Sequence, residues 1–120
     1  MVRKQRSLPE EFNGPLEFAG LVVTLDSLEG ERVCLQVSAT EGPDGVVDVF
    51  GALARMPDRP DGRLRFRVGE EAFFYLLEEE IVEIRLTTLE GSFYFRITIE
   101  LPGVRIAIAD PEIQGYAAME

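Results

Sequence analysis

The sequence contains no histidine, no tryptophan and only one cysteine, Cys34. Histidine is the usual general base near neutral pH, the usual activator of serine and cysteine nucleophiles, and a common ligand of transition metals. Its absence excludes Ser/His/Asp and Cys/His catalytic sites within one chain, and a single cysteine leaves almost no route to an ordinary zinc site. Phosphate-binding loops, dinucleotide-binding glycine motifs and EF-hand spacing are also missing. We therefore expect a protein that is not an enzyme and that binds no cofactor or metal.

A single cysteine cannot form an internal disulfide, so the sequence does not require an oxidising compartment. No apolar run reaches the roughly 18 residues of a membrane span, and the N-terminal segment lacks the apolar core of a secretory signal. These absences predict a cytoplasmic protein that does not enter a membrane. Cys34 alternates onto the polar face of its predicted strand, where it is either a reactive thiol or an inert, partly covered side chain. The inert interpretation is favoured because no cation at a helix start is predicted to lower its pKa.

Positive charge is scarce, since 12 lysine and arginine residues stand against 22 acidic ones and give a formal net charge of -10. Non-specific binding to DNA or RNA depends on a positively charged surface, so general nucleic-acid binding is not expected. An acidic surface favours solubility and basic partners. Any charged partner of this protein is therefore expected to be basic.

The chain fits one domain, because 120 residues of which 46% are hydrophobic can bury a core without disulfides or metals. We expect residues 1–14 to form a flexible N-terminal arm, residues 15–110 a single β-rich domain, and residues 111–120 a C-terminal tail. Turn-rich links separate segments that have the period-two pattern or the β-branched composition of strands. These segments are residues 16–25, 32–39, 46–54, 63–68, 81–88, 92–101 and 104–110. The pattern predicts a mainly β fold, an antiparallel β-barrel or β-sandwich of about seven strands.

The segment after Gly69 is ambiguous. Its glutamate, alanine and leucine content favours one short helix over residues 70–79, with Glu70 and Glu71 near the helix N-terminus. Against the helix, the run Glu78–Glu80 would crowd the negative end of the dipole, and six consecutive apolar residues also suit a buried strand. We expect the helix and keep the strand as the alternative. The glutamate run is either an acidic contact for a basic partner or a solvated end that protects an edge.

Residues 83–97 form the clearest predicted hairpin, and their apolar residues set its register. Aligning the apolar residues here and along the following strand predicts a continuous apolar face. The predicted pairs are Leu86 with Phe95, Ile84 with Ile97, Val82 with Ile99, Ile99 with Ile106, and Ile97 with Ile108. On the opposite face, Arg105 is then predicted to lie across from Glu100, which is a favourable pair.

The same register places Arg85 opposite Arg96, and two like charges that face each other need an explanation. In one interpretation Glu83 bridges both arginines and the face is an ordinary ion-paired surface. In the other, the two guanidinium groups and Tyr94 form a fork for a carboxylate or a phosphate. The ion-paired surface is favoured because such pairs are common. The anion site would extend further if the strand that carries Arg63, Arg65 and Arg67 lay beside this hairpin.

Three loop aspartates, Asp44, Asp58 and Asp61, are the remaining candidates for carboxylate catalysis or calcium binding. Each stands next to a glycine or a proline, where aspartate commonly forms turns. The ligand spacing that would make a calcium site specific is missing. We interpret these aspartates as turn residues.

Taken together, these features indicate a non-enzymatic, acidic β-domain that acts by binding protein. We expect an interaction, adaptor or inhibitor module whose partner is another protein or a second copy of the chain. The alternative is a small-ligand module that recognises an anionic metabolite or nucleotide through Arg85, Arg96, Tyr94, Arg63, Arg65 and Arg67. An enzyme that relies on carboxylates alone ranks third.

Overall fold

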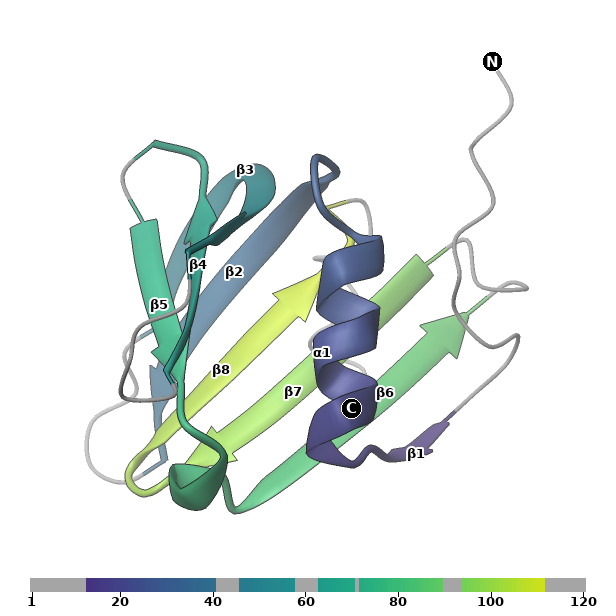
Figure 1. Cartoon of the computed structure of the whole chain (residues 1–120), viewed down its shortest axis with the longest axis vertical. Coiled ribbons are helices and arrows are strands. Elements are labelled where there is room, and N and C mark those ends of the chain that lie inside the picture. The colour runs from purple at the N-terminus through teal and green to yellow at the C-terminus, as the bar shows by residue number, and fades with distance from the viewer. Residues whose placement is uncertain (1–12, 41–45, 58–62, 71, 90–93, 112–120) are drawn as a thin grey trace.

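A computed structural model of the chain describes residues 13–40, 46–57, 63–70, 72–89 and 94–111. These residues form eight strands, one α-helix and one short 3-10 helix (Figure 1). In chain order they are β1 (Asn13–Pro15), α1 (Phe18–Ser27), β2 (Arg32–Ala39), β3 (Val46–Met56), β4 (Leu64–Val68), β5 (Ala72–Leu76), η1 (Glu78–Glu80), β6 (Glu83–Leu89), β7 (Tyr94–Leu101) and β8 (Val104–Ala109).

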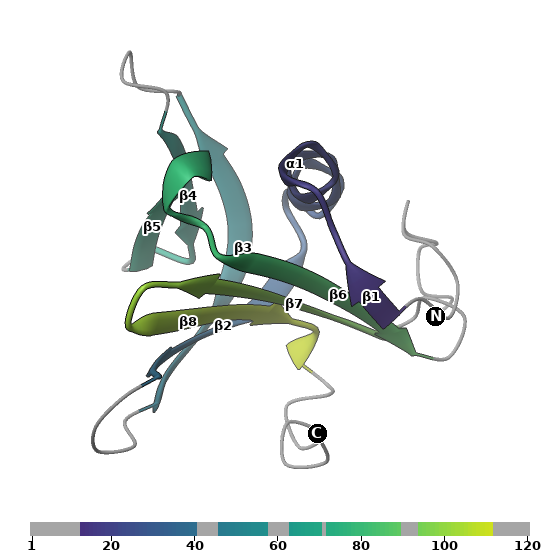
Figure 2. The same cartoon turned by 90° about the horizontal axis from the view of Figure 1, so that it is seen from below.

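All strand pairings are antiparallel, and the strands follow the order β1-β6-β7-β8-β2-β3-β4-β5 in one sheet. The predicted mainly β, antiparallel architecture is therefore confirmed. The long strand β3 changes partner along its length, since residues 46–52 pair with β2 and residues 53–56 pair with β4. The sheet folds over here, so that β4 and β5 lie above the face that α1 also covers (Figures 1 and 2). Within the described residues β1 and β5 do not pair, so the sheet is folded like a sandwich and is not closed into a barrel.

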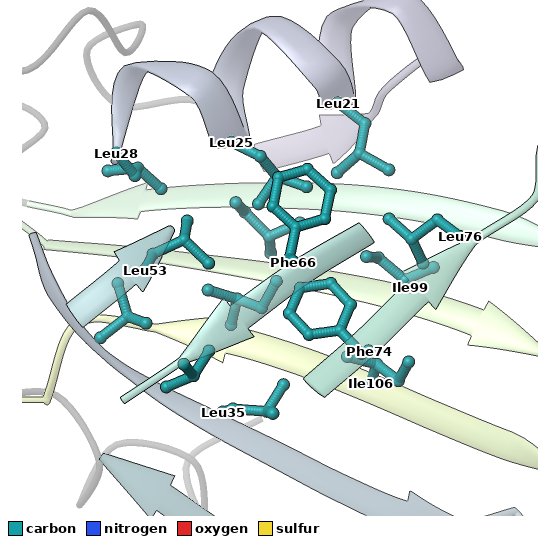
Figure 3. Packing of buried hydrophobic residues seen from close by; sticks show 14 of the residues in the cluster. Leu21, Leu25, Leu28, Leu35, Leu53, Phe66, Phe74, Leu76, Ile99 and Ile106 are labelled. Carbon is teal, nitrogen blue, oxygen red and sulfur yellow. The ribbon is translucent and has the colours of Figure 1, made fainter. Parts of the chain in front are cut away.

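The core lies between the main sheet, α1 and the β4–β5 hairpin (Figure 3). The helix contributes Leu21, Leu25 and Leu28, whose spacing of four and three residues places them on one helical face. The hairpin contributes Phe66 and Phe74, whose rings stack with their centroids 5.2 Å apart. Burying side chains of this size contributes about 1.5–3 kcal/mol each. The inner face of the hairpin that carries β5 is therefore firmly held.

The predicted strand over residues 16–25 is wrong, because most of this segment belongs to α1. Its β-branched residues favoured a strand, but Leu21 and Leu25 follow helical spacing and are fully buried. Burial of this apolar face outweighs intrinsic propensities, which differ by less than about 1 kcal/mol per residue. Thr24 also fits the helix, since its Oγ1 donates a hydrogen bond to the Gly20 carbonyl at 2.7 Å.

The predicted helix over residues 70–79 is also wrong, and the strand alternative is correct for β5. Gly69 adopts a positive φ of 66° and turns the chain from β4 back into β5. Pairing with β4 lets Phe74 and Leu76 enter the core on alternate positions, which a helix here would not allow. The run Glu78–Glu80, which argued against the helix, forms η1 one residue after the strand.

The predicted register of the β6–β7 hairpin is wrong by two residues. The observed pairs on the core face are Ile84 with Ile99, Leu86 with Ile97, and Thr88 with Phe95. A shift of two residues keeps the same side chains on the same face, so apolar alternation cannot distinguish the two registers. The β7–β8 register is as predicted, with Ile99 opposite Ile106 and Ile97 opposite Ile108.

The start of the described chain is part of the sheet. Asn13 and Gly14, which belong to the predicted arm, lie in β1 and pair with Thr87 and Leu86 of β6. Residues 1–12 and the tail from residue 112 lie outside the described residues. No helix in the described part of the chain is long and apolar enough to cross a membrane.

Candidate functional site

Arg85 does not face Arg96. The observed register places Arg85 opposite Thr98 and Arg96 opposite Thr87. Arg85 is exposed, its Nη1 lies 3.6 Å from Oε1 of Glu83, and its Nη2 donates to Oδ1 of Asn13 at 3.4 Å. Glu83 thus lies beside Arg85, one of the two arginines that it was expected to bridge in the ion-paired interpretation. At an exposed site such a pair contributes about 0–1 kcal/mol.

Arg96 lies on the same face of the sheet as Arg85 but reaches across β8 towards β2. Its Nη1 donates a hydrogen bond to Oε1 of Gln36 on β2 at 3.3 Å, and the side chain is half-buried. The two arginines have hydrogen-bond partners on different strands, so this pair does not form the fork that the sequence left as the alternative to an ion-paired surface. Tyr94 begins β7 opposite Leu89, and its side chain lies outside the described parts of the structure. The predicted pair of Arg105 and Glu100 is present, with Nε donating to Oε1 at 2.9 Å.

Arg63, Arg65 and Arg67 lie elsewhere in the sheet. Arg65 and Arg67 belong to β4, which stands between β3 and β5 and does not neighbour β6 or β7. Their cross-strand partners are aromatic, since Arg65 pairs with Tyr75 and Arg67 with Phe73. The Arg63 guanidinium carbon lies 4.8 Å from the centroid of the Tyr75 ring, within the range of a cation–π contact. We call these five residues the arginine–aromatic face.

Cys34 is not available as a nucleophile. Its side chain is only 1% exposed and lies between Phe50 on β3 and Ala109 on β8. Burial, with a smaller contribution from Asp48, raises the pKa of the Cys34 thiol, and Arg96 opposes this only in part. The thiol is therefore protonated at neutral pH, and the thiolate is the reactive form.

Carboxylate and metal chemistry find no support in the described residues. Asp44, Asp58 and Asp61 lie outside them. In the parts of the chain that are described, no group of three or more cysteine, aspartate or glutamate side chains is placed to hold a metal ion.

The feature that the sequence analysis missed is the edge formed by β5. This strand ends the order of the sheet, and in the described structure β4 is its sole paired neighbour. Phe74 and Leu76 face the core, whereas Phe73 is 59% exposed and Tyr75 is 53% exposed. From Ala72 to Leu76 the strand has no charged residue and no proline. Charges and prolines are the usual means of blocking an edge strand, so this edge is open to pairing.

A groove runs beside this edge. It has a volume of about 440 Å³ and lies between β5 and the turn that joins β7 to β8. Val37, Leu101, Val104 and Ile106 line it from the sheet. Among the described residues that line it, Glu80 alone is charged. An apolar depression next to unpaired backbone is suited to alternate side chains of an extended segment.

The opposite edge is different. β1 has three residues, and one of them is Pro15, which has no backbone N–H to donate. Short edge strands and edge prolines discourage further pairing. Figures 1 and 2 place β1 and β5 on opposite sides of the molecule. The sheet therefore has one protected edge and one open edge.

The sequence matches no protein-family model, and no curated protein or solved structure matches it significantly. We therefore infer function from the geometry of the chain itself. The one signal for the open edge in the sequence was the apolar run from Ala72 to Leu77, which lies between acidic residues. The composition of this segment favoured a helix.

Proposed function

We propose that this protein is a non-enzymatic protein-binding module that accepts an extended segment of a partner as an added strand on β5. The observation that supports it best is the combination of an unprotected edge, two exposed aromatic side chains and an adjoining apolar groove. Strand addition uses backbone hydrogen bonds for affinity and alternate side chains for specificity. An adaptor or an inhibitor would work in this way.

The two faces of an added strand would meet different surfaces. Side chains on its inner face would lie beside Phe74, which lines the groove, because side chains in neighbouring antiparallel strands point to the same face when they lie opposite each other. Those on its outer face would pack against Phe73 and Tyr75. Aromatic residues of this kind often contribute most of the binding energy at an interface.

A cross-linking experiment tests this proposal. A photoreactive phenylalanine analogue placed at position 75 should capture a specific protein in cells of the source organism. The same analogue at position 23, where Val23 is 66% exposed on α1, is the matched control and should not capture it. Phe73→Lys, which adds an edge charge of the kind that blocks strand pairing, should abolish capture, and Val23→Lys should not. Equal capture from both positions, or none from position 75, would contradict the proposal.

A second candidate is the binding of an anionic ligand at the arginine–aromatic face. Two arginines next to two exposed aromatic rings can hold a phosphate or carboxylate and stack on a planar group. Melting the protein with increasing pyrophosphate or nucleoside triphosphate, at constant ionic strength, should then show saturable stabilisation. Arg65→Gln should lose this effect and Arg105→Gln should keep it. Identical curves for all three proteins would exclude the candidate.

A further inference from the structure

The two ends of β5 carry the same charge. Glu70 lies exposed in the turn before the strand, and Glu78, Glu79 and Glu80 lie exposed in η1 directly after it. The strand between them is uncharged. An added strand would therefore have an apolar middle and would meet negative charge at both of its ends.

A second copy of the chain fits this pattern poorly. In a two-fold antiparallel pairing centred on Phe74, which matches all of β5 with its copy, Glu70 of each chain lies opposite Glu78 of the other. Like charges directly opposite in a sheet are unfavourable, and two such pairs would form. The net charge of -10 on each copy adds long-range repulsion.

The arginines of β4 do not offset the negative charge that a strand added to β5 would meet. An added strand would lie about 5 Å from β5 and about 10 Å from β4, because neighbouring strands are about 4.8 Å apart. Arg65 and Arg67 also lie opposite the middle of β5. They are therefore one strand further from the partner than the glutamates, and they do not stand at its ends. Arg63 already lies over the Tyr75 ring. The glutamates at the ends of β5 are therefore the charges that the partner meets.

From these observations we infer that the partner of β5 is an extended segment with alternating apolar residues and lysine or arginine at both ends. This inference rests on the proposed strand addition and names the chemistry of what is added. The groove of about 440 Å³ is roughly fifteen times the ~30 Å³ that a water molecule occupies in the liquid, so it accommodates more than one apolar side chain. Glu80 lines the groove and offers a carboxylate to the basic end. Because both ends of β5 are acidic, basic residues at both ends satisfy either strand direction.

Synthetic peptides of about ten residues, a usual upper length for a strand, test the inference on the full-length protein. The first peptide alternates valine and threonine and has two lysines at each end, and the second has glutamates in place of the lysines. The third is the lysine peptide with its apolar run N-methylated, which removes the backbone donors but keeps the charges. Fluorescence anisotropy should show binding of the lysine peptide, at least about tenfold weaker binding of the glutamate peptide, and no binding of the N-methylated one.

Protein variants locate the effect. Combining Glu78→Gln with Glu80→Gln should weaken binding of the lysine peptide several-fold and leave the affinity for the glutamate peptide unchanged or higher. Asp26→Asn on α1 is the control and should change the binding of neither peptide. Added salt should weaken the binding of the lysine peptide and not that of the glutamate peptide. Equal binding of the lysine and glutamate peptides, with no binding of the N-methylated peptide, would overturn the inference about charge and would still support strand addition. Binding that survives N-methylation, or no binding of either peptide, would overturn both. A stable dimer of the protein at low salt, lost in Phe73→Lys, would replace the basic partner by a second copy.

Discussion

Two glycines allow the β4–β5 hairpin to lie against β3. A side chain at Gly51 would place its Cβ 2.5 Å from both the Cα and the N of Gly69. Gly69 in turn donates its N–H to the Ala52 carbonyl at 3.0 Å, which ties the hairpin turn to β3. The close approach of these two backbones therefore positions the edge strand above the main sheet.

Gly51→Ala should lower the free energy of unfolding by about 1–3 kcal/mol, because the backbone of Gly69 has to move. Gly20→Ala is the matched control. The new Cβ would lie 3.6 Å from Leu16, an ordinary contact distance, and alanine is preferred to glycine within a helix. Gly20→Ala should therefore stabilise the protein by about 0.5–1 kcal/mol. Urea unfolding of the three proteins measures both effects. A Gly51→Ala protein as stable as the original would show that the two backbones are not packed this closely.

Cys34 should resist thiol reagents in the folded protein. Its side chain is buried and its pKa is raised, so both access and the thiolate fraction are low. Because the folded state holds the proton more tightly than the unfolded chain, stability should fall as pH rises through the ordinary cysteine pKa of about 9.0. Labelling with a chromogenic disulfide, with and without denaturant, and comparison with Cys34→Ala across this pH range provide the check. Rapid labelling of the folded protein would contradict the burial.

Among the elements of the fold, α1 is held against the core by the side chains on one of its faces. Leu21, Leu25 and Leu28 are buried, whereas Val23 is exposed. An ion pair also joins α1 to the sheet, because Arg55 of β3 donates to both carboxylate oxygens of Asp26 on α1, at 2.9 and 2.8 Å. The apolar face provides most of the attachment, because a partly exposed ion pair contributes less than about 1 kcal/mol.

Leu25→Ala should therefore destabilise the protein by about 2–5 kcal/mol. Val23→Ala, two residues away on the exposed side, should change stability by no more than about 0.5 kcal/mol. A strand over this segment would place both side chains on the same face and give them similar effects. Thermal or urea unfolding of the two variants distinguishes helix from strand.

The sequence predicted strands where one face is apolar and the other mostly polar, as in β2 and β7, because alternation then identifies the pattern. It failed at α1, where β-branched residues such as Val22 and Val23 hid the helical spacing of the leucines. It failed at β5 for the opposite reason, since helix-forming glutamates flank a short apolar strand. The sequence could not determine the β6–β7 register, because period-two alternation is unchanged by a two-residue shift.

The candidate site depended on these tertiary details. Arg85 and Arg96 were expected to converge from a register that the structure does not have. The three arginines around β4 lie beside aromatic residues of β5, a neighbour that no local pattern specified. The exposure of Phe73 and Tyr75 follows from the place of β5 at the end of the sheet, and strand order is a property of the whole fold.

At the scale of the whole molecule, one open edge is combined with a strong negative charge. Repulsion between copies of charge -10 opposes edge-to-edge association of the free protein. Sedimentation velocity should therefore show a monomer at low salt and an increasing dimer fraction as added salt shortens the Debye length from about 30 Å to about 3 Å. Phe73→Lys should remain monomeric throughout. Association that is strongest at low salt would contradict this account of the charges.

We propose that β5 is the edge to which a partner strand is added. Hydrogen exchange of the backbone amides, measured with and without the lysine peptide, reports on this edge residue by residue. We predict that protection increases in residues 72–76 and does not change in β1, where Pro15 and the short strand leave little to pair. Peptide binding that leaves the exchange of residues 72–76 unchanged, or that protects β1 in their place, would contradict the claim.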